Sequence, residues 1–72
     1  KVMYILTAVL HKEEDMYVAE CPEVGTVSQG MTIEEAVSNL KEATALYLEE
    51  FPLTKDRRSI ITTFEVIPAA KT

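Results

Sequence analysis

The stretch that decides the fold is residues 25–50, G-T-V-S-Q-G-M-T-I-E-E-A-V-S-N-L-K-E-A-T-A-L-Y-L-E-E. It predicts a short strand, a turn at Gly30 and one amphipathic helix over residues 33–50. Thr32 precedes Glu35 by three residues, which is the spacing of a capping box. In such a box the Thr32 hydroxyl accepts from the Glu35 N–H, and the Glu35 carboxylate accepts from the Thr32 N–H. Gly30 permits a tight exit from the strand because glycine has no Cβ.

The predicted helix has an apolar face and an acidic face. Apolar residues recur at three- and four-residue steps, so they share one face that we expect to bury against a sheet. They are Ile33, Ala36, Val37, Leu40, Ala43, Tyr47 and Phe51, and Thr44 lies on the same face. On the opposite side Glu35, Glu42 and Glu49 stand seven residues apart and form one acidic stripe, with Leu46 beside it. This surface is either an ordinary solvated face or, on the sharper interpretation, a contact surface for a basic partner protein.

Length, charge and cysteine content restrict the classes of protein to which the chain can belong. Seventy-two residues predict a single domain, residues 1–72. Twelve acidic against seven basic side chains give a net charge of −5, which argues against direct binding to nucleic acid and suits a basic protein partner. The single cysteine, Cys21, points to a reducing compartment. Because no apolar run approaches the roughly 20 residues of a membrane span and no signal segment opens the chain, we expect a soluble cytoplasmic protein.

Four stretches have the β-branched and aliphatic composition of strands. They are residues 2–10 (V-M-Y-I-L-T-A-V-L), 16–21, 26–29 and 60–67 (I-I-T-T-F-E-V-I), with a polar turn at 11–15. The predicted element order is therefore β-β-β-α-β, an α+β fold. The first three strands form an antiparallel meander, and a right-handed crossover then places the last strand beside the first. This gives a four-stranded sheet of order 3-2-1-4 with one helix on one face, and its central strand, the first, is apolar on both sides.

One helix covers only one face of such a sheet. The other face would expose apolar side chains of the first and last strands, such as Met3, Ile5 and Val9 with Ile60 or Ile61. An apolar patch of this kind is a liability for a lone monomer. We therefore expect a homodimer or homotetramer. The outer side of strand 60–67 is also available for pairing with another chain.

No constellation of catalytic residues stands out in the sequence. His11 lies in a charged turn without a positioned partner, so we interpret it as solvated. Cys21 has no C-x-x-C companion and is interpreted as a structural residue at a strand end. We assign no catalytic residue, no cofactor and no metal, and expect a protein that is not an enzyme.

The enzymatic alternative is a reduced nuclease with a metal held by carboxylates. Asp15, Glu20, Glu23 and Glu65 lie on or near predicted strands and are the candidates for such a site. The predicted central strand, however, carries no carboxylate on which a metal site would be centred. We therefore interpret these four acids as solvated charges at edges and turns, which also hinder aggregation.

Lys55, Arg57 and Arg58 form the one basic cluster. It is interrupted by an aspartate and has no interleaved aromatic residues, so it is a weak nucleic-acid signal. We expect it instead to neutralise the helix C-terminus, where Glu49 and Glu50 face the negative end of the helix dipole.

Residues 3–51 also carry an ordered series of short motifs. They are Asp15, Tyr17 and Val18 in the hairpin, Pro22 and Gly25 in the turn, Ser28-Gln29-Gly30, then Thr32, Glu34-Glu35-Ala36, Asn39, Glu42-Ala43 and Tyr47-Leu48-Glu49 on the helix. In this order and spacing they resemble the HicB antitoxin family. The resemblance implies a partial RNase H-like fold and a role in neutralising HicA, a small, basic, RNA-cleaving toxin.

The resemblance extends the interpretation of the acidic stripe. By analogy, Glu35, Glu42, Leu46 and Glu49, or the acids near the hairpin, would cover cationic residues of a HicA-like toxin. Many HicB proteins carry a DNA-binding domain, for which this chain has no room before Thr72, so we expect no DNA binding. The alternatives are a stand-alone oligomeric interaction module with an unknown partner and the reduced RNase H-like nuclease.

Overall fold

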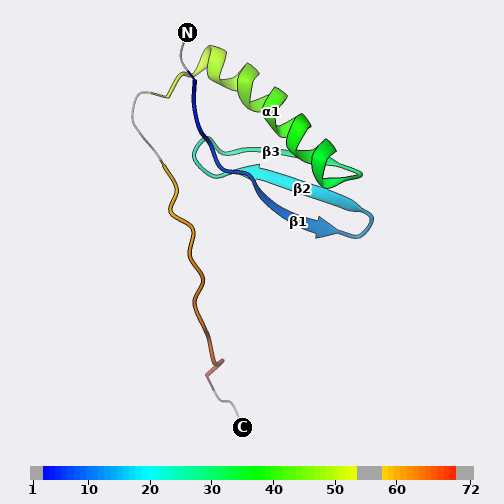
Figure 1. Cartoon of the computed structure of the whole chain (residues 1–72), viewed down its shortest axis with the longest axis vertical. Helices are drawn as coiled ribbons and strands as arrows, with labels where there is room; N and C mark the ends of the chain where they lie inside the picture. Colours follow the sequence, from blue (N-terminus) through cyan, green and yellow to red (C-terminus); the bar gives the residue numbers. More distant parts are fainter. Residues whose placement is uncertain (1–2, 54–57, 70–72) are drawn as a thin grey trace.

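The computed structural model of the protein describes residues 3–53 and 58–69. Its regular elements are β1 (Val9–Glu13), β2 (Met16–Cys21), β3 (Thr26–Gly30) and α1 (Ile33–Glu50). The three strands form one antiparallel sheet in the order β1-β2-β3, and α1 packs on one of its faces (Figure 1). The α+β class and the bounds of β2 and α1 agree with the sequence prediction.

Helix α1 begins and ends at the residues that the sequence indicates. The Thr32 hydroxyl accepts from the Glu35 N–H at 3.0 Å, which is the predicted cap. The Glu35 carboxylate accepts from the Met31 N–H, one residue before the predicted Thr32. At the other end the Phe51 N–H closes the last turn, and Pro52 follows. Proline disfavours a helical conformation in the residue before it, so the helix stops there.

The first hairpin is shifted from its predicted position. Its turn is only Glu14 and Asp15, and residues 11–13, predicted as turn, belong to β1. The β1–β2 ladder runs from Glu13 opposite Met16 to Val9 opposite Glu20. It goes no further toward the N-terminus because β2 ends at Cys21. The segment 3–8, predicted as part of the first strand (residues 2–10), therefore lies outside the ladder.

The predicted fourth strand, residues 60–67, is described but forms no strand. It extends away from the sheet and helix (Figure 1), and Ile60 and Ile67 are each 93% exposed. The order 3-2-1-4 is thus not formed within the described chain, and β1 is an edge strand. The open edge of β1 and of the segment 3–8 thus has no strand partner within the described chain.

The core lies between α1 and the β2–β3 half of the sheet. Its buried members are Ala19, Cys21, Ala36 and Leu40, with Leu6, Leu10, Tyr17 and Val24 half-buried around them. Thr44 is also buried, and its hydroxyl is 2.6 Å from that of Thr26 on β3. The Asn39 amide donates to the Gln29 carbonyl at 2.8 Å. These polar bonds fix the register of the helix over β3.

The predicted apolar helix face was too long. Ala36, Leu40 and Thr44 are buried as expected, but Ile33 and Phe51 are 49% and 59% exposed. An 18-residue helix is about 27 Å long, whereas a five-residue strand spans only about 17 Å. Both ends of α1 therefore overhang the sheet.

Gly30 is needed for space rather than for a special backbone angle. A Cβ built on it would meet the Ala36 backbone nitrogen at 2.6 Å. Its φ is not positive, unlike that of Gly25 at +96°. The prediction that Gly30 permits a tight exit from the strand because it has no Cβ is confirmed. The missing side chain lets the first turn of α1 lie against the end of β3.

Candidate functional site

The acidic stripe (Glu35, Glu42, Leu46 and Glu49) lies on the solvent side of α1. All four side chains are exposed, and Leu46 is 61% exposed. Glu35 and Glu49 are 14 residues apart, about 21 Å along the axis at 1.5 Å per residue. The helix carries five glutamates and one lysine, with no basic residue in its last turn. It therefore presents a strongly negative surface with an apolar side chain in its middle.

The members of the stripe are not equivalent. The Glu35 carboxylate is engaged in the cap, where it accepts from the Met31 N–H. Glu42 and Glu49 project from the exposed surface on either side of Leu46. Glu49 also lies at the negative end of the helix dipole, an unfavourable place for a carboxylate. A nearby cation would relieve this repulsion.

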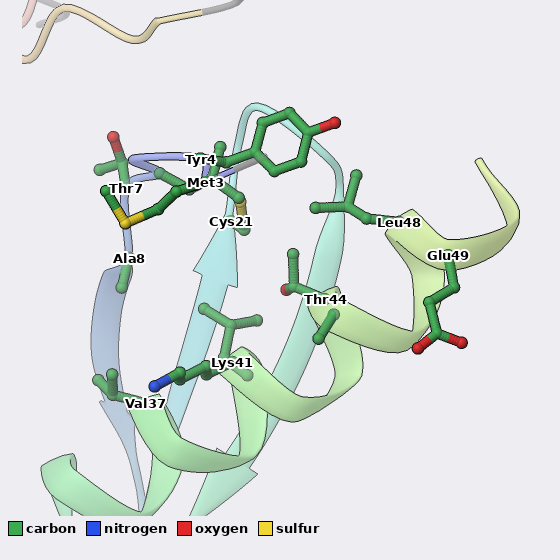
Figure 2. A pocket seen from close by; sticks show the side chains of 13 residues that line it. Met3, Tyr4, Thr7, Ala8, Cys21, Val37, Lys41, Thr44, Leu48 and Glu49 are labelled. Atoms are coloured by element: carbon green, nitrogen blue, oxygen red, sulfur yellow. The ribbon is translucent and has the colours of Figure 1, made fainter. Parts of the chain in front are cut away.

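Beside the stripe an open groove of about 750 Å³ separates the N-terminal segment, residues 3–8, from the C-terminal half of α1. Figure 2 shows Met3 and Tyr4 on one side of the groove and Thr44 and Leu48 across it. Most of its lining is apolar, while Lys41 and Glu49 belong to the lining contributed by the helix. The groove is a mainly apolar surface feature that the sequence analysis did not identify.

Buried Glu23 holds the N-terminal segment in place as one wall of the groove. Only 6% of Glu23 is exposed. Its carboxylate accepts from the Thr7 N–H at 3.0 Å, from the Thr7 hydroxyl at 2.6 Å and from the Cys21 thiol at 3.4 Å. Burial alone would raise the pKa of Glu23, but the bonds from Thr7, with smaller help from its own backbone and from Cys21, lower that pKa to about 2.

Glu23 was interpreted from the sequence as a solvated charge, and that interpretation was wrong. A signal for its role was present, because Thr7 is, apart from Tyr4, the one polar residue in the stretch 2–10. The pairing of Val9 with Glu20 places Thr7 opposite the turn that follows β2. A polar side chain there needs a hydrogen-bond partner, and the turn supplies Glu23. Cys21 is buried as expected of a structural residue, and burial raises the pKa of its thiol.

The other polar candidates do not converge on a site. Among residues 3–53 and 58–69, no three His, Cys, Asp or Glu side chains are placed to hold a metal ion. Asp15 and Glu20 are exposed on the hairpin, and Glu65 is exposed in the segment 58–69. Thus the four carboxylates of the nuclease alternative form no cluster of the predicted kind. His11 Nε2 lies 3.0 Å from the Glu13 carboxylate at the surface.

The basic cluster that we expected to neutralise the C-terminus of the helix is only partly described. Lys55 and Arg57 lie outside the described residues, and Arg58 is exposed. Within the part of the chain that is described, no helix is both long enough and apolar enough to cross a membrane.

Comparison with known proteins found two small bacterial relatives. A "UPF0150 protein" of Helicobacter pylori (strain J99) is 38% identical, and the match covers 86% of this chain and 94% of the relative. A "UPF0150 protein" of Synechocystis sp. is 49% identical over 68% of this chain and 65% of the relative. No protein-family profile matches the chain. No solved structure matches it significantly.

Proposed function

Because the chain belongs to the UPF0150 family, we propose that it is an antitoxin-like binding protein that neutralises a HicA-type RNA-cleaving toxin. Neutralisation takes place in the cytoplasm by protein–protein occlusion, without catalysis. The proposal is supported by the resemblance of residues 3–51 to HicB antitoxins. The finer assignment to a partial RNase H-like fold with a four-stranded sheet is part of this proposal.

The observation that carries the proposal is the composition of the exposed helix face. Glu42 and Glu49 flank Leu46, and the helix as a whole has four more acidic than basic side chains, five against one. A partner with lysines or arginines around a small apolar pocket is complementary to this arrangement. The charges steer the approach and fix the register. The leucine contributes most of its energy once water is excluded from around it.

Occlusion requires that the toxin surface covered by α1 include residues that contact RNA. A basic RNA-cleaving protein needs cations to hold the phosphate backbone, and the carboxylates of Glu42 and Glu49 compete for those cations. RNA and the exposed face of α1 then cannot bind the toxin at the same time. Glu35 contributes less because its carboxylate is held in the cap.

The test is charge reversal on the helix with a matched control elsewhere. We expect E42K/E49K to weaken binding to a HicA-type toxin from the same organism at least tenfold and to restore RNA cleavage in its presence. The control D15K/E20K changes the net charge by the same amount on the hairpin and should leave the affinity within about twofold.

Circular dichroism checks that both double variants keep the helix, and calorimetric titration measures the affinity. Unchanged affinity in E42K/E49K would show that the stripe is not the contact surface. A loss confined to D15K/E20K would move that surface to the hairpin acids. If the unmodified protein binds no HicA-type toxin, the proposed function itself is wrong.

A further inference from the structure

The most unusual feature of the molecule is the C-terminal arm, residues 60–67. Its apolar side chains are among the most exposed of the described chain, with Phe64 at 84% and Ile67 at 93%. The arm is rich in β-branched residues and closes with Pro68. It has strand composition but no strand partner (Figure 1). Soluble proteins seldom leave such a run uncovered, because it templates association with other chains.

One side of the arm is mainly apolar and uncharged. Alternate residues of an extended chain point to opposite faces, so the arm places Ile60, Thr62, Phe64 and Val66 on one face and Ile61, Thr63, Glu65 and Ile67 on the other. The first face carries no charge and has the aromatic ring near its centre. The second face contains Glu65, which must remain in contact with water. The Phe64 face is therefore the one suited to burial.

A matching edge is open at the other end of the molecule. In the sheet, β1 pairs only with β2, and the N-terminal segment continues past β1 with Met3 and Ile5 both 83% exposed. Thr7 turns its N–H to Glu23 on the β2 side. Because successive N–H groups of an extended chain alternate between its two edges, a strand that pairs on the open edge would use the N–H groups of Leu6 and Ala8. A further strand can pair there.

The groove lies directly beneath this edge. It is bounded by the N-terminal segment on one side and by Val37, Ala45 and Leu48 on the other, with a volume of about 750 Å³. An eight-residue strand is about 26 Å long at 3.3 Å per residue, as is the stretch 3–10 beside which it would lie. A strand on this edge projects alternate side chains over the groove. The Phe64 face of the arm supplies the apolar side chains that such a strand requires.

We propose that the arm of one copy binds to a second copy of this chain, as a strand beside residues 3–8 with Phe64 in the groove. The second copy is the occupant because the arm extends away from its own sheet and helix (Figure 1). Every copy carries both an arm and a groove, so exchange is reciprocal and closes a two-fold dimer. Each copy then gains a strand beside residues 3–8, which extends the open edge of its sheet beyond the start of β1. This assembly does not depend on the toxin-binding proposal.

The test compares two neighbouring substitutions on opposite faces of the arm. Phe64→Glu places a charge in the groove, whereas Thr63→Glu places the same charge on the face that already carries Glu65. By light scattering after size exclusion, at micromolar concentration, we expect a dimer of twice 8.1 kDa for the unmodified chain and for T63E. F64E should elute at the monomer mass. Phe64 lies far outside the core, so circular dichroism should show unchanged helix content.

Hydrogen exchange locates the contact. We expect amides of residues 60–67 and of residues 3–8 to be protected together in the dimer, and to lose that protection together in F64E or on dilution. The proposal is overturned if the chain is monomeric at every concentration, because the arm then folds on its own body or stays exposed. It is equally overturned if F64E remains dimeric. Protection of the arm alone, without residues 3–8, would show that two arms pair with each other instead.

Discussion

The carboxylate of Glu23 accepts two hydrogen bonds from Thr7, one from its amide at 3.0 Å and one from its hydroxyl at 2.6 Å. The pair spans 16 positions of sequence and joins the N-terminal segment to the turn after β2. Beyond the end of the sheet, the Glu23 side chain thus takes the place of backbone strand pairing in holding the N-terminal segment. This ionised group holds the wall of the groove together with the packing of Leu6 against the core.

The first prediction is a pH dependence of stability that comes from Glu23. Its pKa falls from an ordinary value of 4.5 to about 2 on folding, so the unfolded chain binds a proton at a higher pH than the folded chain does. The stabilisation is therefore complete above about pH 4.5 and is lost as the pH falls from there toward 2. We expect Glu23→Gln to lower the free energy of unfolding by about 1 to 3 kcal/mol at pH 7.

Urea denaturation at pH 7 and at pH 2.5 measures this effect. The stability difference between the unmodified chain and E23Q should shrink at the lower pH, because most of the stabilisation by the ionised carboxylate has been lost there. Glu20→Gln serves as the control because Glu20 is exposed on the neighbouring strand. A difference for E23Q that stays constant between the two pH values would show that ionisation of Glu23 does not stabilise the fold.

The second prediction separates the roles of the two glycines. In Gly30→Ala the new methyl group meets the backbone nitrogen of Ala36 at 2.6 Å, and backbone atoms cannot rotate away as a side chain can. We expect a loss of about 1 to 3 kcal/mol from overpacking, accompanied by displacement of the first turn of α1. Amide chemical shifts across residues 30–37 report that displacement, and thermal unfolding reports the loss.

Gly25→Ala is the matched comparison. No atom lies within 4 Å of its Cβ position, but its φ is +96°, so the cost is backbone strain of about 1 to 2 kcal/mol. The helix should not move in this variant. If Gly30→Ala leaves the shifts of the first helical turn unchanged, the close approach of helix and strand is not what requires the glycine.

The third prediction assigns Glu35 a structural role. Thr32→Ala removes the hydroxyl that caps the Glu35 N–H and should cost about 1 kcal/mol. Glu35→Ala removes the acceptor for the Met31 N–H together with a favourable charge at the helix N-terminus, and should cost about as much. Glu42→Ala, on an exposed middle turn, should change stability by less than about 0.5 kcal/mol.

Chemical denaturation of the three variants at one pH gives these values side by side. E35A and E42A can also be compared for affinity to a partner. There we expect the opposite order, with a larger loss of affinity in E42A than in E35A. Equal stability of E35A and E42A would mean that the cap bond to Met31 is not maintained in solution.

Local signals in the sequence were sufficient for the hairpin–helix half of the fold. The capping spacing at Thr32, the proline after Phe51 and the composition of residues 16–21 each act over a few residues, and the elements they predict are present. What failed depended on contacts between distant residues. The apolar composition of residues 2–10 predicts a strand, but the extent of β1 is set by where β2 ends.

The acidic stripe could be predicted from local sequence, whereas the groove depends on contacts between distant residues. A spacing of seven residues is enough by itself to place Glu35, Glu42 and Glu49 on one side of a helix. The groove exists only because the N-terminal segment lies across from α1, held there by the long-range bond between Thr7 and Glu23. Strand composition also cannot say whether residues 60–67 pair within the chain, because the same pattern suits a partner's sheet.

The last prediction concerns the hairpin turn, where Glu14 has a φ of +55°. This left-handed conformation costs an ordinary L-residue about 1 to 2 kcal/mol, and asparagine tolerates it better. We expect Glu14→Asn to raise the free energy of unfolding by up to about 1 kcal/mol. The matched change Asp15→Asn, at the neighbouring turn residue, whose φ is not positive, should have little effect. Because each variant removes one negative charge, a gain that appears in both would reflect charge rather than backbone strain, and measurement at high salt would abolish it.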